Sequence, residues 1–392
     1  MRSNGLLITL LLWLLPLAFP LDSFSEEFSV DTTLGKVVGR RDEQNTVVYL
    51  GIPYAEPPLG KLRFRPPVPK RPWAPRVHYA MNFSNDCLQS ALYSTGKFQR
   101  TRSEDCLFLN IFRPTRTRMN TPLPVLFWVY GGAFIQGSAS RDEYYASRLA
   151  ARGVIVVTIN YRLGALGFLV STSDGLFGNY GLDDQKLAMQ WVQDNIAAFG
   201  GDPARVTLFG ESAGAMSIGL HFLDQERRQR SPTLFQGLIL QSNPLGYKYR
   251  NIVVANFLGT DYKELLDCED LRCLQSESAD ELIHVQDTLM AVPRSLGDFF
   301  TWGPVVTDHH YQREVRLRPG PVSDIEVLQP LQQLSQRRPL QLQVLAQTHS
   351  PPSTSFPEAC SEIQSQMIVC VSPSPFQPFP SSLLLRLLLS AS

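Results

Sequence analysis

A glycine-flanked serine, placed between a short apolar run and a helical pattern, constrains this chain more than any other feature. The motif GESAG at 210–214 follows residues 206–209, which predict a buried strand, and it leads into residues 213–222, which predict a helix. Glycines at both ends of the motif allow a sharp turn, and the turn exposes the hydroxyl of Ser212 above a sheet. Such a serine acts as a nucleophile when a carboxylate and a histidine follow it in the chain.

A second glycine motif, YGGAF at 130–134, follows directly from an apolar run and offers flexible backbone with N–H groups to donate. Acyl transfer places a negative charge on the former carbonyl oxygen of the substrate. Preorganised donors stabilise that charge, and loss of one donor typically costs about 3–4 kcal/mol. Each motif alone is compatible with an ordinary turn. Together and in this order they predict an oxyanion site beside a nucleophile.

Apolar runs at 124–130 and 154–159 predict strands that are buried on both faces of a sheet. Between the second run and the serine motif, residues 183–199 show helical spacing, and residues 234–240 predict a further strand. Strands that alternate with helices are connected by right-handed crossovers. The sequence therefore predicts an α/β fold with a mostly parallel central sheet and helices on both faces.

The N-terminus has the layout of a signal peptide. Arg2 precedes an apolar run at 6–19, and polar sequence begins at Asp22. The run is too short to span a membrane, and the alternative is a buried N-terminal strand. We predict a signal peptide over 1–20, no transmembrane segment, and a chain that enters the secretory pathway, where it is secreted or retained in the endoplasmic reticulum.

Cysteine spacing and a glycosylation triplet agree with that compartment. Adjacent spacing suggests two local disulfide loops, Cys87–Cys106 and Cys268–Cys273, and Asn82 begins an N-x-S acceptor triplet. The remaining cysteines are Cys360 and Cys370. No C-x-x-C pair occurs and no histidine lies beside a cysteine pair, so we predict neither a metal site nor a cofactor.

The 36 basic residues balance the 36 acidic ones, so nothing in the composition indicates a nucleic-acid partner. The character of the chain changes near residue 310: residues 311–392 contain 11 Pro, 11 Gln and a single Gly. A segment of this composition buries too little apolar surface to offset its ordering entropy. We therefore predict a partial domain over 21–309 and a disordered Pro/Gln/Leu-rich tail over 310–392.

Five segments in order resemble the type-B carboxylesterase and cholinesterase family, which has the α/β-hydrolase fold. They are YLGIPYA at 49–55, EDCLFLN at 104–110, NYR at 160–162, FGGDP at 199–203 and FGESAG at 209–214. The resemblance covers about residues 28–308 and implies both disulfides proposed above.

The resemblance also implies Ser212 as nucleophile, with oxyanion donors from the backbone of Gly132, Ala133 and Ala213. Ala133 stands where many members have a third glycine, but its N–H is still present. By the same resemblance, Glu211 orders water near the site. The implied substrate is a small ester, thioester or amide, and the sequence leaves the oligomeric state open.

The acid and the histidine of the family have no recognisable counterparts in this chain. Carboxylates after Asp308 lack the flanking glycine of the family's acidic motif; they are Glu314, Asp324 and Glu326. Four histidines follow the serine at a useful distance, none in a family-like loop, and each is better interpreted as a surface or core residue. These are His284, His309, His310 and His349. The sequence thus predicts an α/β-hydrolase whose C-terminal part is missing.

A serine without a base is a poor nucleophile at neutral pH. We therefore predict a serine carboxylic-ester hydrolase by family whose chain, as given, is inactive. The alternative is a non-catalytic binding or adhesion-type member of the family, although such members typically lack the nucleophile that is intact here. Residues 88–105, the predicted first disulfide loop, contain no tryptophan, which disfavours the choline pocket of the family's choline-binding members.

Overall fold

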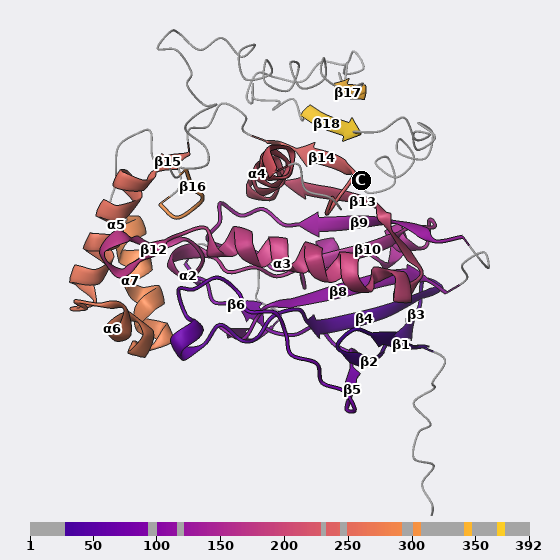
Figure 1. The fold of residues 1–392 in the computed structure, drawn as a ribbon, viewed down its shortest axis with the longest axis horizontal. Helices are drawn as coiled ribbons and strands as arrows, with labels where there is room; N and C mark the ends of the chain where they lie inside the picture. Colours follow the sequence, from indigo (N-terminus) through magenta and orange to yellow (C-terminus); the bar gives the residue numbers. More distant parts are fainter. Residues whose placement is uncertain are drawn as a thin grey trace, which may run out of the picture.

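A nine-stranded sheet forms the centre of the described molecule (Figure 1). The computed structural model describes residues 28–92, 100–115, 121–228, 233–243, 249–291 and 301–306, together with the backbone of 341–346 and 367–372. The strands lie side by side in the order β17 (Gln341–Ala346), β18 (Met367–Ser372), β14 (Gly237–Gln241), β13 (Gly201–Glu211), β9 (Leu123–Val129), β10 (Ile155–Ile159), β8 (Phe108–Pro114), β4 (Thr46–Pro53) and β3 (Arg40–Asp42).

The sheet is mixed, which corrects the prediction of a mostly parallel one. Only its centre is parallel: β13 pairs in parallel with β9 and β14, and β9 pairs in parallel with β10. All other neighbours in the sheet are antiparallel. The sequence prediction rested on the parallel strands alone. On the N-terminal side, a short turn at Asn45 joins β3 to β4, and a turn of that length permits only antiparallel pairing.

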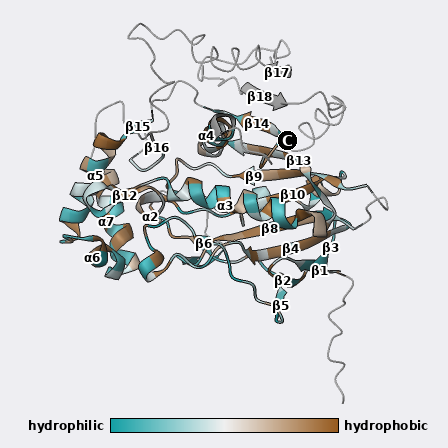
Figure 2. Cartoon of the chain, in the orientation of Figure 1, coloured by the Kyte–Doolittle hydropathy of each residue, from teal (hydrophilic) through white to brown (hydrophobic). Residues whose placement is uncertain are grey.

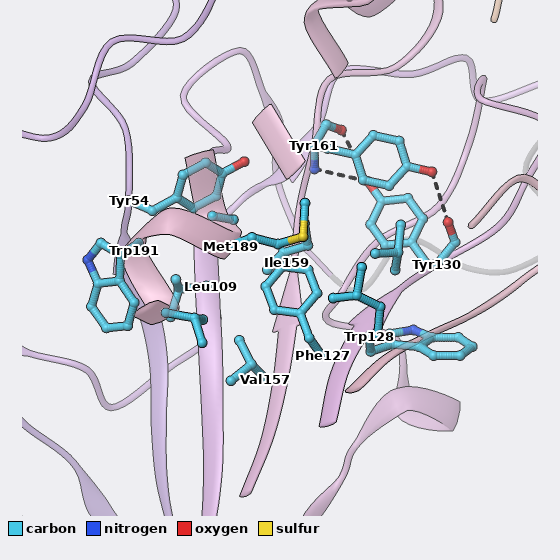
Figure 3. Close-up of a cluster of buried hydrophobic side chains, with 14 of the residues drawn as sticks. Tyr54, Leu109, Phe127, Trp128, Tyr130, Val157, Ile159, Tyr161, Met189 and Trp191 are labelled. Carbon is cyan, nitrogen blue, oxygen red and sulfur yellow. Dashed lines mark hydrogen bonds between the residues drawn. The ribbon is translucent and has the colours of Figure 1, made fainter. Parts of the chain in front are cut away.

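The parallel strands are buried on both faces because their side chains alternate between two apolar clusters. Phe127 and Val157 point into the larger cluster, whereas Leu126 and Val156 point into a smaller one. Figure 3 shows the larger cluster around Phe127, with Met189 packed against it. Both faces of the centre are therefore closed to water, as the continuous apolar runs predict.

Helices cover both faces. The larger cluster packs beneath α3 (Tyr180–Asn195) and α4 (Ala213–Arg228), and the smaller one beneath α1 (Ser147–Ala150). The helix predicted at 183–199 begins three residues earlier and ends in a 3-10 turn, η5 (Ile196–Phe199). Gly200 then stops it with a φ of 84°.

Three further helices form another apolar cluster, separate from the two on the faces of the sheet, at one end of the sheet (Figure 1). They are α5 (Ile252–Leu265), α6 (Leu271–Ser276) and α7 (Ala279–Ala291). A small sheet of β1 (Ser29–Thr32), β2 (Gly35–Val38) and β5 (Val77–Tyr79) lies beside β4 and β3. The remaining short elements are η2 (Gly60–Leu62), β6 (Asp86–Cys87), β7 (Arg102–Ser103), η3 (Asp142–Tyr144), α2 (Gly164–Phe168), β11 (Val170–Ser171), η4 (Thr172–Asp174), β12 (Leu176–Phe177), β15 (Arg250–Asn251) and β16 (Val305–Val306).

Two segments of the Pro- and Gln-rich region form strands, although that region was predicted to hold no regular element. The segments QLQVLA and MIVCVS become β17 and β18, and β18 pairs with β14. Both are short and carry apolar and β-branched residues typical of strands, which the average composition of the region conceals. The rest of 310–392 and the predicted signal peptide at 1–20 lie outside the described residues. Within the described part, no helix is long and apolar enough to cross a membrane.

Candidate functional site

Ser212 lies at the turn between β13 and α4, as the motif predicts. Its φ is 52°, a left-handed conformation that non-glycine residues rarely adopt. The turn is held on both sides: the Ser212 N–H donates to Gln241 O of β14 at 3.0 Å, and the Ser212 carbonyl accepts from Met216 N–H at 2.9 Å. The strained backbone is therefore fixed by the sheet and by the first turn of the helix.

The two glycines of the motif let this turn approach the end of β9. A Cβ at Gly210 would lie 2.7 Å from the carbonyl oxygen of Val129, and a Cβ at Gly214 would collide with the same oxygen. Gly219, one turn further along α4, faces only the side-chain nitrogen of Asn243 at 3.6 Å. Close backbone packing thus requires glycine at the motif positions and not elsewhere in the helix.

The YGGAF loop lies directly beside Ser212. A Cβ at Gly131 would lie 3.2 Å from the Cβ of Ser212. Gly132 and Ala133 have φ values of 116° and 53°, and the N–H groups of the next residues fold back onto the Gly132 carbonyl. Within the part of the chain that the structure describes, the N–H groups of Gly132 and Ala133 make no hydrogen bond.

Ala213 supplies a third free N–H because it opens α4, and the first N–H groups of a helix have no partner within it. Gly132 and Ala133 follow Gly131, which lies against Ser212, and Ala213 is the next residue after Ser212. The positive end of the helix dipole also lies at this point and favours a negative charge. Backbone N–H groups are the kind of donor that stabilises a tetrahedral oxyanion, so the oxyanion role of these three residues stays a prediction.

Two tyrosines that the sequence analysis did not single out hold this loop in place (Figure 3). Tyr130 and Tyr161 follow β9 and β10, and their rings stack with centroids 4.5 Å apart. Each hydroxyl donates to the other residue's carbonyl, at 2.8 Å from Tyr161 and 3.2 Å from Tyr130. The pair was not predicted because it joins residues 31 positions apart, and only strand pairing brings them together.

Glu211 lies between the serine and the YGGAF loop. A Cβ at Gly131 would lie 2.6 Å from the Glu211 carbonyl oxygen and 2.9 Å from its carboxyl Oε2. Desolvation raises the pKa of the Glu211 carboxyl above its usual value. The role of Glu211 in ordering water near Ser212 stays a prediction.

A buried polar chain braces α4 against α3. His221 Nε2 lies 2.8 Å from Gln185 Oε1, Gln185 Nε2 donates to Ser217 Oγ at 3.2 Å, and Ser217 Oγ donates to the Ala213 carbonyl at 3.0 Å. Burial lowers the pKa of His221 to about 4, so the imidazole is neutral at physiological pH. With Gln185 Oε1 as acceptor, the proton of that imidazole is on Nε2. His221 is therefore a structural core residue, and helical spacing alone does not reveal its partner on α3.

Of the described histidines, His78 and His221 hydrogen-bond to partners other than Ser212, and His284 is exposed. His78 Nε2 lies 3.0 Å from the Gly51 carbonyl, and His284 is exposed on α7. Among the residues that the structure describes, no histidine is hydrogen-bonded to the serine. The other candidates for acid and base lie outside the described residues; they are His309, His310, His349, Glu314, Asp324 and Glu326.

Both predicted disulfides are present, Cys87–Cys106 and Cys268–Cys273. Glu277 lies beside Cys268 and Cys273. The sulfurs of these two cysteines are bonded to each other and therefore offer no thiolate to a metal. Cys370 lies in β18, and Cys360 is outside the described residues. Asn82 is exposed in a loop before β6, so its side chain is accessible.

Comparison with known proteins identifies relatives across most of the chain. A profile of the carboxylesterase family matches residues 26–347. Acetylcholinesterase of Electrophorus electricus is 39% identical over 326 residues, which make up 77% of this chain and 50% of that protein. Cholinesterase of Mus musculus is 38% identical over 325 residues, or 74% of this chain and 52% of that protein.

Among solved structures, a PNB esterase superposes with a TM-score of 0.64 at 36% identity, covering 71% of this chain and 57% of the esterase. A thermophilic PNB esterase gives a TM-score of 0.65 at 37% identity, with the same coverage. These similarities agree with the predicted α/β-hydrolase fold. The chain spans about half the length of the curated relatives it matches.

Proposed function

Because the chain belongs to the carboxylesterase family, we propose that Ser212 is the nucleophile of a carboxylic-ester hydrolase and that this chain by itself lacks the histidine base that activates it. One observation carries the proposal. Ser212 lies on a strained turn against the YGGAF loop, and among the described residues the N–H groups of Gly132 and Ala133 make no hydrogen bond, nor does any histidine bond to the serine.

The reaction proceeds through an acyl-enzyme. Ser212 Oγ attacks the carbonyl carbon of the ester, and the hydroxyl proton passes to a base. The N–H groups of Gly132, Ala133 and Ala213 donate to the oxyanion, and its collapse expels the alcohol and leaves the acyl group on the serine. Water then attacks the acyl-serine and releases the carboxylic acid. Thioesters and amides with apolar acyl groups fit the same steps, and no step needs a cofactor.

A missing base limits the chain as given to slow chemistry. Loss of catalytic-triad members lowers turnover by about a million-fold in a well-studied protease, while oxyanion donors and binding alone retain roughly 10³–10⁴ over water. A purely adhesive function is less well supported, because an adhesion protein gains nothing from a serine at φ 52° beside free donors.

We further propose that the chain enters the secretory pathway and carries a glycan on Asn82. Two disulfides support an oxidising compartment. The exposure of Asn82 supports access for a glycosyltransferase. A shift in mass after glycosidase treatment, lost in Asn82→Gln, tests the second point.

Chemical rescue tests the missing base. Hydrolysis of a short-chain nitrophenyl ester is measured with and without added imidazole, for the wild type and for Ser212→Ala. Since imidazole alone cleaves such esters, the quantity of interest is the difference between the two proteins. We expect imidazole to raise the rate of the wild type above that of the variant. Equal rates at every imidazole concentration, from protein with native circular dichroism, would show that Ser212 is not a competent nucleophile.

A further inference from the structure

The charge of this neutral chain is unevenly distributed. Residues 28–85 contain nine Lys and Arg against four Asp and Glu, and residues 57–85 contain six basic residues and no acidic one. The rest of the chain therefore carries a compensating negative charge. A neutral protein with one basic segment has a local positive field rather than a general one.

The basic segment is rigid. Residues 57–75 contain seven prolines, each of which restricts the backbone. The segment is also tied to its surroundings: Glu56 N–H donates to Val68 O at 2.8 Å, Lys70 N–H donates to Tyr54 O at 3.2 Å, and Trp73 N–H donates to Leu34 O at 2.7 Å. The backbone that carries these cations is preorganised, so binding a partner costs side-chain entropy but little backbone entropy.

The cations lie along the small sheet of β1, β2 and β5. Lys36 of β2 is in register with Val77, the residue after Arg76. The indole N–H of Trp73 donates to the Lys36 carbonyl at 3.1 Å, which brings the segment around residue 73 against β2. Two residues beyond the ends of β2 and β5, Arg40 of β3 donates from Nε to Met81 O at 3.0 Å.

Lys70 and Arg71 complete this surface beside β5. Lys70 interacts electrostatically with His78 of β5. The side chain of Arg71 is 87% exposed. We define the basic surface as Lys36, Arg40, Lys70, Arg71 and Arg76. Figure 2 shows β5, at the bottom of the view, in the hydrophilic colour.

Three carboxylates near this surface neutralise its five cations only in part. Asp31 pairs with Lys36 and Asp42 with Arg40, while Glu56 lies between Lys70 and Arg71. The Lys36–Asp31 pair joins exposed side chains, and exposed pairs contribute only about 0–1 kcal/mol, whereas Asp42 beside Arg40 and Glu56 beside Lys70 are more buried. Among the described residues, Arg76 makes no ion pair. A multivalent anion can therefore replace the exposed contact at Lys36 and bind the exposed Arg71 and Arg76 directly.

We propose that the basic surface binds a sulfated glycosaminoglycan. Its cations follow two strands and a rigid segment instead of converging on a pocket, and this arrangement fits a linear polyanion rather than a single phosphate. Exposed Tyr79, on the same strand β5, offers a flat face for a sugar ring. Two disulfides indicate an oxidising compartment, and sulfated polysaccharides are polyanions present there. The strongly anionic membrane surface, by contrast, faces the cytoplasm.

Heparin oligosaccharide binding to the purified full chain, measured by calorimetry over a range of salt concentrations, tests this proposal. Arg71→Glu/Arg76→Glu is compared with Arg148→Glu/Arg152→Glu, which changes the net charge equally at exposed positions outside the segment. We expect the first variant to weaken binding by about tenfold or more and to lower the salt slope by about 2. The second should change Kd by less than about twofold, and Arg71→Lys/Arg76→Lys should retain the slope.

Four results would overturn the proposal. They are the absence of heparin binding by the wild type, an equal loss in both charge-reversal variants, equally tight binding of unsulfated hyaluronan, and tighter binding to vesicles of phosphatidylserine and phosphatidylcholine. The last would assign the surface to a membrane instead. Matching circular dichroism spectra of the variants ensure that folding does not cause the differences. None of these readouts depends on ester hydrolysis.

Discussion

The two neighbours of β13, β9 and β14, contact the candidate site in different ways. On one side, β9 ends at the YGGAF loop, and its last carbonyl lies against both glycines of the serine motif. On the other side, β14 accepts one hydrogen bond from Ser212, and beyond it lie the antiparallel β18 and β17. Both neighbours are parallel to β13, but only β9 is interlocked with the turn by backbone contacts too close for any side chain.

This difference shows which elements fix the positions of the groups in the candidate site. The proposed nucleophile and oxyanion donors come from one pair of strands and the helix that follows, and those three elements pack backbone against backbone. The β14 side contributes a boundary to the sheet rather than a chemical group among the described residues. We therefore expect substitutions on the β9 side to have the larger effects.

The largest effect is expected from Gly214→Ala. The new Cβ would collide with the Val129 carbonyl, and neither the helix nor the strand can move without disturbing Ser212. We expect the free energy of unfolding to fall by about 3–4 kcal/mol, measured by urea denaturation. Gly219→Ala is the matched control in the same helix, and it should be neutral or stabilise by up to about 1 kcal/mol. Equal effects of the two changes would contradict the interlocking of α4 and β9.

The next effect appears on acidification, through His221. Its pKa is about 4 in the folded chain against an ordinary value of 6.5. Between these pH values the unfolded chain binds the proton and the folded chain does not, so stability falls as the pH drops. The loss amounts to about 2–3 kcal/mol by pH 4.

His221→Gln removes this titration and retains an N–H donor for Gln185. The pH dependence of the unfolding free energy should therefore flatten between about pH 6.5 and 4 in the variant. His284→Gln, an exposed change on α7, should leave the wild-type dependence intact. If both variants kept the wild-type slope, His221 would not be buried in its neutral form.

A smaller effect of opposite sign comes from Asp183, on the neighbouring helix α3. Burial, with repulsion from Asp184, raises its pKa to about 6 from 3.8. The folded chain thus binds the proton more tightly, so the stability contributed below pH 3.8 is lost as the pH rises through 6. Asp183→Asn should raise the unfolding free energy at pH 7 by about 1–2 kcal/mol, but not near pH 3.8.

Asp194→Asn, an exposed change in the same helix, is the control and should stay within about 0.5 kcal/mol at both pH values. A gain for Asp183→Asn that persisted below pH 3.8 would point to packing rather than to charge.

The smallest effect is expected on the other side of the sheet. Val369→Pro removes one backbone donor from β18, which pairs with β14 on one side and β17 on the other. We expect a loss of about 1 kcal/mol in unfolding free energy, the net contribution of one hydrogen bond. A loss as large as that of Gly214→Ala would mean that β18 is an integral part of the core and would remove the contrast between the two sides.

The sequence predicted those parts of the fold that are encoded locally. The buried strands, the turn at Ser212 and the loop at Gly132 each follow from a contiguous pattern, and the structure brings them together. Sheet direction outside the centre was not predicted correctly, because pairing partners are chosen by contacts far apart in the chain. The same is true of Tyr130 with Tyr161 and of His221 with Gln185: a side-chain hydrogen bond between elements leaves no periodic signal.

The proposal that this chain lacks the base for Ser212 is tested by the hydrolysis of a short-chain nitrophenyl ester, measured for the wild type and for Ser212→Ala without imidazole. We expect equal, near-background rates from two folded proteins, because we propose that this chain has the serine and its oxyanion donors but lacks the base. Turnover that disappears in Ser212→Ala would contradict the proposal, and would mean that a histidine and an acid elsewhere in this chain complete the site.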